Sequence, residues 1–233
     1  MKKFFFLILT VSFAFFEVLY SQKTLDKGFI KMELTDVSAT DPQVGASLEM
    51  MKGSQTEIYF TPEKSVSFMS MMGGMVEIKN YADHTSKSND MLFNMMGNKT
   101  WVTMPMKDEN NEDVKKMMES AQIEKMPNDT KTISGYKCSK VVVKLPEADL
   151  ELVAYVTDEI KNSTNPVQGF EGFNFGGFPL EFTTKNTMFS MTMSTKEISD
   201  KVDEKKLTMK TDGYQKMTLE EFQKSMGGMG FGF

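Results

Sequence analysis

Residues 130–160 restrict the fold of this chain more than any other stretch. The run from Lys137 to Lys144 contains three consecutive valines, which favour an extended backbone over a helix. Pro146 interrupts the pattern, because proline fixes its own φ angle and cannot donate to a strand ladder. A second run, from Leu150 to Thr157, then places alternate apolar residues on one face. The stretch therefore predicts two paired antiparallel strands with one buried face.

The same strand pattern recurs along the chain with short turns between its runs. Parallel strands need crossovers of a dozen or more residues, so these turns favour antiparallel neighbours. The expected strands are 28–34, 57–61, 66–72, 75–80, 91–96, 99–104, 180–184, 188–195 and 205–210. Helical spacing of apolar residues over 110–121 predicts one helix, and a capping box at 218–221 predicts a second. The sequence thus predicts a mainly β fold with two or three short helices.

The N-terminus has the form of an export signal. Two lysines precede an apolar run from Phe4 to Phe16, a length typical of a signal peptide and too short for a stable membrane span, and cleavage is expected after Ser21. We expect 1–21 to be removed, which leaves a β domain over 22–216 and, over 217–233, a short helix with a disordered Gly/Met tail. The mature protein is then exported, periplasmic or extracellular, with no transmembrane segment.

Three short motifs resemble a family of secreted bacterial proteins. They are Gly135-Tyr136-Lys137-Cys138, Ala154 to Ile160, and Gly177-Phe178-Pro179-Leu180-Glu181. Together they resemble a domain-of-unknown-function family related to the GLPGLI type, and the segment 212–221 extends the likeness. The resemblance implies a fold similar to periplasmic lipoprotein carriers, in which a strongly curved antiparallel sheet, an open or half barrel, surrounds an apolar concavity. Short helices would cover its open side. The resemblance implies no established activity.

Composition excludes several classes of function. The chain has 27 basic and 32 acidic residues, so its net charge of −5 argues against nucleic acid as a partner. Cys138 is the single cysteine and His84 the single histidine, so hydrolase triads and zinc sites lack their usual residues. A lone strand cysteine is most often a small buried apolar residue. We therefore expect no enzyme activity and no cofactor.

Methionine is unusually abundant, with 23 residues in the chain. Three interpretations stay open: methionine as core filler, as the lining of a site for an acyl chain or lipid-like ligand, and as a soft ligand for Cu(I). In the second, the lining residues are Met69, Met71, Phe93, Trp101, Met191 and Met193, with four phenylalanines from a glycine-rich loop. In the third, the copper ligands are Met69, Met71, Met72 and Met75.

The glycine-rich loop over 167–178 carries Phe170, Phe173, Phe175 and Phe178. Four exposed rings would make an aggregation-prone patch, so we expect them to fold onto the apolar concavity. They act either as a mobile lid over a bound ligand or as a permanent plug of the core. A third function, interaction with a protein of the cell envelope, would use this loop as its contact.

Overall fold

The computed structural model describes residues 22–104, 119–162, 166–167 and 175–226, and within them one large sheet dominates. Its strands lie in the order β14-β7-β6-β5-β4-β3-β2-β13-β12-β10-β9-β8. They are β2 (Gly28–Ala39), β3 (Gln55–Phe60), β4 (Lys64–Met71), β5 (Val76–Asp83), β6 (Ser88–Met95), β7 (Asn98–Met104), β8 (Gln122–Ile133), β9 (Tyr136–Leu145), β10 (Leu150–Thr157), β12 (Phe178–Lys185), β13 (Phe189–Ser199) and β14 (Gln215–Met217). The predicted central hairpin is confirmed as β9 and β10, which pair from Leu145/Leu150 to Ser139/Val156.

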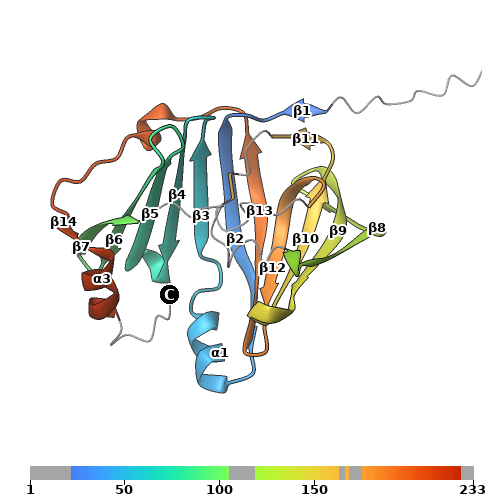
Figure 1. Ribbon diagram of the computed structural model, residues 1–233, viewed down its shortest axis with the longest axis horizontal. Helices are drawn as coiled ribbons and strands as arrows, with labels where there is room; N and C mark the ends of the chain where they lie inside the picture. The colour runs from blue at the N-terminus through green and yellow to red at the C-terminus, as the bar shows by residue number, and fades with distance from the viewer. Residues whose placement is uncertain (1–21, 105–118, 163–165, 168–174, 227–233) are drawn as a thin grey trace, which may run out of the picture.

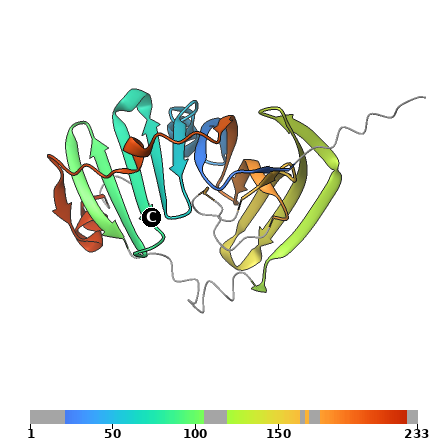
Figure 2. The same ribbon diagram turned by 90° about the horizontal axis from the view of Figure 1, so that it is seen from above.

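The sheet is strongly curved and does not close. Seen from above it forms an open arc, with its two ends turned toward the same side (Figures 1 and 2). Every neighbouring pair is antiparallel except β14 and β7, which are parallel. A separate pair, β1 (Lys23–Thr24) and β11 (Ile160–Lys161), lies across one end of the molecule. The prediction of a mainly β, open curved sheet is therefore confirmed, apart from the one parallel edge.

The middle of the arc joins distant parts of the chain. β2 follows the N-terminal strand β1, yet it lies between β3 and the late strand β13. The β2–β13 ladder runs from Phe189/Ala39 to Ser199/Phe29, and it contains two register shifts. Sequence pattern alone predicted both strands but not their pairing.

The helices differ in part from the prediction. Thr218 starts α3 (Leu219–Met226) through the expected capping box: its hydroxyl accepts from the Glu221 N–H, and the Glu221 carboxylate accepts from the Thr218 N–H. The sequence analysis missed α1 (Pro42–Glu49), whose first N–H groups bond to the Asp41 carboxylate. The helix expected over 110–121 lies outside the described residues except at its end.

The strand predicted at 205–210 is wrong. The short 3-10 helix η3 (Glu204–Leu207) lies there instead, since the Asp203 carboxylate accepts from the Lys205 N–H and starts a helical turn. The other short helices are η1 (Met72–Gly74) and η2 (Pro146–Ala148). Strand β8 was also missed, because most of its side chains are exposed and it shows no apolar alternation.

Two apolar cores occupy the two halves of the arc. The larger one packs side chains of β2, β3, β9, β10 and β12, and includes the fully buried Phe60, Leu145 and Leu180. The smaller one packs β4 to β7 against α3, which covers it with Phe222. The candidate site lies on the strands between these two cores.

Candidate functional site

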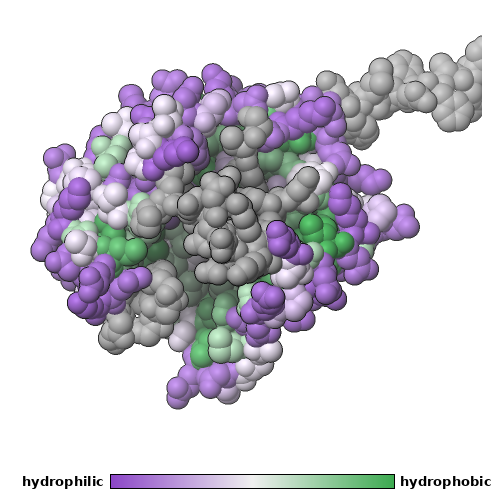
Figure 3. Space-filling model, in the orientation of Figure 1, coloured by the Kyte–Doolittle hydropathy of each residue, from purple (hydrophilic) through white to green (hydrophobic). Residues whose placement is uncertain are grey.

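A pocket of about 320 Å³ opens on the concave face of the sheet, over its central strands. Figure 3 looks onto this face and shows apolar residues in patches on either side of and below its centre, with hydrophilic ones gathered at the rim. The pocket is lined by Met32, Leu34, Met51, Ser54, Thr56, Ile58, Ser67, Met69, Met71, Asn80, Val167, Phe182, Thr184, Met191 and Met193. Strands β2, β3, β4, β5, β12 and β13 all contribute, so the site depends on the long-range pairing at the middle of the arc.

Strand alternation explains why these side chains meet. Residues two apart in a strand point to the same face. Met69 and Met71 therefore project together from β4, and Met191 and Met193 do so from β13. Met69 and Met71 thus converge with Met191 and Met193 on one pocket, from two strands that lie apart in the sheet order.

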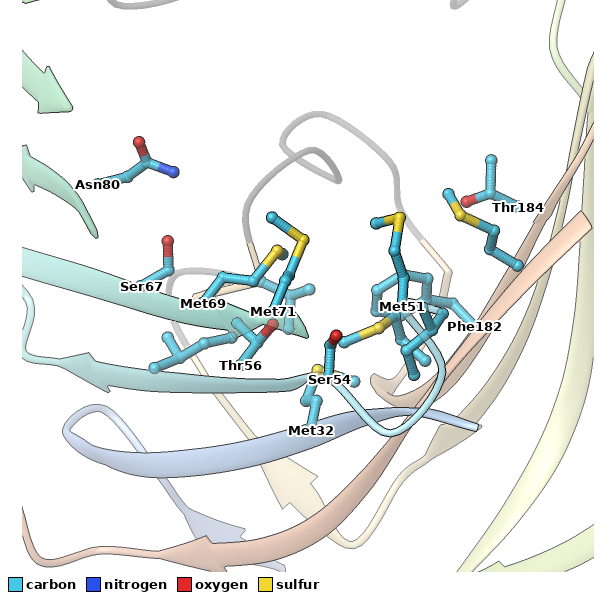
Figure 4. A pocket seen from close by; sticks show the side chains of 15 residues that line it. Met32, Met51, Ser54, Thr56, Ser67, Met69, Met71, Asn80, Phe182 and Thr184 are labelled. Carbon is cyan, nitrogen blue, oxygen red and sulfur yellow. The ribbon is translucent and has the colours of Figure 1, made fainter. Parts of the chain in front are cut away.

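Six methionines line the pocket in all, because Met32 of β2 and Met51 after α1 join the two pairs. Figure 4 shows the Met69, Met71 and Met51 side chains extending into the same space, with Phe182 beside them. Methionine has a flexible, unbranched side chain that adapts to apolar partners of different shape. The lining is therefore deformable, unlike one built of valine and isoleucine.

Among the residues that the structure describes, the lining contains no aspartate, glutamate, lysine or histidine. Its polar atoms come from serine, threonine and asparagine side chains. Among the described residues, the buried side-chain oxygens Thr56 Oγ1 and Asn80 Oδ1 have no hydrogen-bond partner. An unsatisfied buried polar atom costs stability, so these two oxygens mark where a donor group of a ligand would be favoured.

Two of the residues expected in the lining lie elsewhere. Phe93 of β6 is buried in the smaller core, where Phe222 of α3 covers it. Trp101 of β7 alternates with the buried Val102 and so lies on the opposite face; its indole N–H donates to Asp90 over 2.9 Å, and the Lys216 ammonium lies 4.2 Å from its ring centroid. Sequence pattern could not show that α3 covers one ring, or which face of β7 is concave.

The phenylalanines of the glycine-rich loop are described only in part. Phe175 and Phe178 are buried in the larger core, with 3% and 5% of their surface exposed. That burial is what a plug of the core requires. Phe170 and Phe173 lie outside the described residues, so the choice between lid and plug stays a prediction for them.

The four methionines expected to bind copper do not share one place. Met69 and Met71 face the pocket, Met72 belongs to η1 and lines a separate surface hollow beside Met50, and Met75 is 48% exposed. The Gly73-Gly74 turn then reverses the chain, so Met72 packs against the same core cluster as Met69 and Met71 without lining their pocket, while Met75 lies beyond the turn. Among the described residues, no three His, Cys, Asp or Glu side chains are grouped as a metal site.

The sole histidine contacts a serine hydroxyl, a pair of groups that also occurs in hydrolase triads. His84 Nε2, in the turn between β5 and β6, lies 3.3 Å from the hydroxyl of Ser65 at the start of β4. A nucleophile and base need a third group to orient the base. The nearby Asp83 carboxylate instead accepts from the Thr85 and Ser86 N–H groups. The described residues therefore provide a serine–histidine contact but no triad.

No family model matches the chain, and no curated protein matches its sequence. The resemblance to the GLPGLI-related family thus stays a prediction. Among solved structures, the chain is similar to the Mycobacterium tuberculosis lipoprotein LppX, with 9% identity and a TM-score of 0.42, over 77% of this chain and 89% of that one. LprF from Mycobacterium bovis gives 12% identity and a TM-score of 0.34, over 76% and 88%. These scores are too low to bear on what this chain binds.

The helices within the described ranges are all too short or too polar to cross a membrane. The expected signal peptide, 1–21, and the C-terminal tail after Met226 lie outside those ranges. Export and the domain limits therefore stay predictions.

Proposed function

We propose that this protein is a non-enzymatic binding protein that holds an apolar ligand in the methionine-lined pocket. The observation that carries the proposal is a concave, uncharged lining built from six methionines, Phe182 and several aliphatic side chains. Ligand pockets are typically mostly apolar with a few polar groups, and this one has that composition. Export to the periplasm or the cell exterior, predicted from 1–21, would place it where lipids are exchanged.

The size of the pocket limits the ligand. A volume of 320 Å³ holds about ten methylene-sized groups, at roughly 30 Å³ each. Burial of a methylene is worth about 0.8 kcal/mol, so ten of them supply at most about 8 kcal/mol, which corresponds to micromolar affinity. We therefore expect a chain of medium length, or one segment of a longer chain, with a Kd in the micromolar range or weaker.

The lining also limits the polar end of the ligand. A carboxylate buried here would meet no lysine or histidine of the described lining, and an unpaired buried charge is strongly disfavoured. A neutral donor, such as a hydroxyl or an amide, could bond to the unpaired oxygens of Thr56 and Asn80 after a side-chain rotation. The preferred ligand is therefore a neutral lipid-like molecule, such as an alcohol or a monoacylglycerol.

Displacement of a neutral fluorescent dye, 1-N-phenylnaphthylamine, tests this proposal. Decanol should displace the dye from the folded protein, and decanoate at neutral pH should do so at least about tenfold less well, because its charge would be unpaired. The double variant Met69→Phe/Met193→Phe fills the pocket and should lose dye and decanol together. Its matched control, Met96→Phe/Met188→Phe, makes the same change at two exposed positions and should bind normally.

If the Met69→Phe/Met193→Phe variant still bound decanol as wild type does, the ligand site would not be this pocket. Equal binding of decanol and decanoate would be consistent with a site in this pocket. It would refute the preference of that site for a neutral ligand. Unfolding curves of both variants show whether a loss of binding reflects a loss of fold.

Copper is the second candidate function, favoured by the convergence of Met69, Met71, Met191 and Met193 on one pocket. Thioethers are soft ligands suited to Cu(I). The quadruple variant with leucine at these four positions keeps the apolar volume but removes the sulfurs. Copper binding predicts that wild type takes Cu(I) from a competing chelator and that the leucine variant does not; lipid binding predicts that the leucine variant still binds decanol.

An envelope partner for the loop at 170–178 is the third candidate. Affinity capture with the native loop, and with the loop replaced by a Ser/Gly linker, separates this function from ligand binding. Only an interaction role predicts partners that are lost with the loop.

A further inference from the structure

A second hollow, of about 300 Å³, lies on the opposite face of the sheet from the methionine pocket. It forms where the segment around η3 crosses strands β3, β4 and β5 (Figure 1). We call it the lysine cleft, and its lining is Tyr59, Val66, Phe68, Lys79, Tyr81, Lys205, Lys206, Thr208 and Lys210.

The charge of the lysine cleft is opposite in sign to the net charge of the whole chain. Its lining carries four lysines and no carboxylate, although the chain has a net charge of −5. The neighbouring hollow, which shares Val66, Tyr81 and Thr208 with it, has Asp83 and Asp90 in its lining and a single lysine, Lys64, that pairs with Asp83. The lining of the lysine cleft is therefore more positive than that of the hollow beside it.

The four ammonium groups lack carboxylate partners. Within the described ranges, none of Lys79, Lys205, Lys206 and Lys210 forms an ion pair. Carboxylates do lie nearby, since Glu57 accepts from the Tyr59 hydroxyl over 2.8 Å, but they do not line the cleft. Four unpaired cations around one hollow repel each other and favour a bound anion.

Aromatic rings hold two of these cations in place. The Lys79 ammonium lies 5.1 Å from the Phe68 ring centroid, and the Lys206 ammonium lies 5.5 Å from the Tyr59 ring centroid. Cation–π contacts of this kind orient the ammonium group without neutralising its charge. Tyr81 and Thr208 add hydroxyl groups to the same lining.

We propose that the lysine cleft binds a phosphorylated sugar ring. Lysine is a frequent ligand of phosphate. The aromatic and valine side chains offer an apolar surface for a ring face, while the hydroxyl groups can bond to those of a sugar. A volume of 300 Å³ accommodates about ten non-hydrogen groups, roughly a sugar ring without its phosphate. The sugar is either a free molecule or the headgroup of a glycolipid, and both present the same chemistry.

Calorimetric titration of the folded protein tests the proposal with three soluble probes: glucose 6-phosphate, glucose and inorganic phosphate. We expect glucose 6-phosphate to bind more tightly than inorganic phosphate, and glucose not to bind. Binding should weaken as salt is raised, because the contacts are between charges near the surface.

Two matched double variants locate the site. Lys79→Gln/Lys206→Gln should weaken glucose 6-phosphate binding by about tenfold or more, since it removes two charge-assisted contacts. Lys144→Gln/Lys185→Gln removes the same charge from exposed positions on β9 and β12, in the other half of the sheet, and should leave binding unchanged. Equal loss in both variants, or equal binding of inorganic phosphate and glucose 6-phosphate, would overturn the proposal.

Two further measurements complete the test. Phosphatidylcholine vesicles with and without a phosphorylated inositol lipid distinguish a headgroup from a free sugar, because only a headgroup ligand predicts vesicle binding that glucose 6-phosphate displaces. A single-stranded oligonucleotide tests the competing ligand class, since lysine and aromatic side chains also bind nucleic acid. Oligonucleotide binding tighter than that of the sugar phosphate would refute the assignment.

Discussion

The rings of Phe93 and Phe222 meet edge to face, with centroids 5.4 Å apart and planes at 74°. This contact fixes α3 to the smaller core, where Phe222 is 3% exposed. We expect Phe222→Ala to lower the free energy of unfolding by about 3–5 kcal/mol, as large-to-small core substitutions do. Lys224→Ala, on the same helix but exposed, should change it by less than about 0.5 kcal/mol. Urea unfolding of the two variants measures the difference, and similar values would mean that α3 does not stabilise the core.

Cys138 should be unreactive in the folded protein. Its side chain is fully buried, and burial raises the pKa of the thiol from 9.0 to about 11. The thiolate is the reactive form, so a thiol reagent at about pH 8 should label the native protein far more slowly than the protein in urea. Equal labelling rates would show that the cysteine is accessible.

The same raised pKa makes stability depend on pH. Between pH 9 and pH 11 the unfolded chain loses the Cys138 proton while the folded chain keeps it, so the folded state is progressively disfavoured as pH rises. The stabilisation from the protonated thiol is complete below pH 9 and amounts to about 3 kcal/mol, since each pKa unit is worth about 1.4 kcal/mol. The unfolding free energy of wild type should therefore fall more steeply over this range than that of Cys138→Ala. The tyrosines ionise alike in both proteins and so do not affect the comparison. Parallel curves of unfolding free energy against pH would contradict the prediction.

Two glycines should respond oppositely to alanine. A Cβ atom at Gly28 would lie 2.1 Å from the carbonyl oxygen of Ser199, at the end of the β2–β13 ladder, whereas one at Gly45 in α1 would meet nothing closer than 3.9 Å. We expect Gly28→Ala to destabilise the fold by more than about 2 kcal/mol through the backbone clash. Gly45→Ala should stabilise it by about 0.5–1 kcal/mol, because alanine favours a helix. Thermal unfolding of both variants is the measurement, and a neutral Gly28→Ala would rule out the close approach.

The capping box of α3 should contribute a pH-dependent stabilisation. Hydrogen bonds from the Thr218 N–H and then its hydroxyl lower the pKa of the Glu221 carboxyl. A lowered pKa means that the contribution is present above pH 4.5 and is lost as the pH falls further. Thr218→Ala should cost about 1 kcal/mol at neutral pH. The loss of stability caused by Thr218→Ala should become smaller as the pH falls below 4.5. Glu220→Gln changes a carboxylate outside the capping box, and its effect on stability should not vary with pH in this way.

Strand pattern predicted the strands between β2 and β13 well where one face is buried. It failed at β8, whose side chains face solvent, because an exposed strand has no apolar alternation to detect. At η3 the alternation of apolar and polar residues resembled a strand, but Asp203 started a turn of helix. The Asp41-Pro42 pair is a helix-start signal that could have revealed α1.

The candidate site could be predicted only in part. Met69, Met71, Met191 and Met193 were found from their spacing, since residues two apart share a face. Their convergence with Met32 depends on the pairing of β2 with β13, which is a long-range property of the fold. The lysine cleft was missed entirely, because its lysines come from β5 and from the segment around η3, which no pattern brings together.

The pairing of β2 with β13 has a consequence for the order in which the chain folds. The Thr35 hydroxyl bonds to the carbonyl oxygen of Thr192, 157 positions away, whereas β3 to β6 pair only with their neighbours in sequence. Closing so long a loop costs entropy before any contact repays it, and topologies with distant contacts fold slowly. The hairpins of β3 to β7 can form early, but the methionine pocket cannot exist until nearly the whole chain has been synthesised. The methionine pocket is therefore expected to be among the last parts of the fold to form.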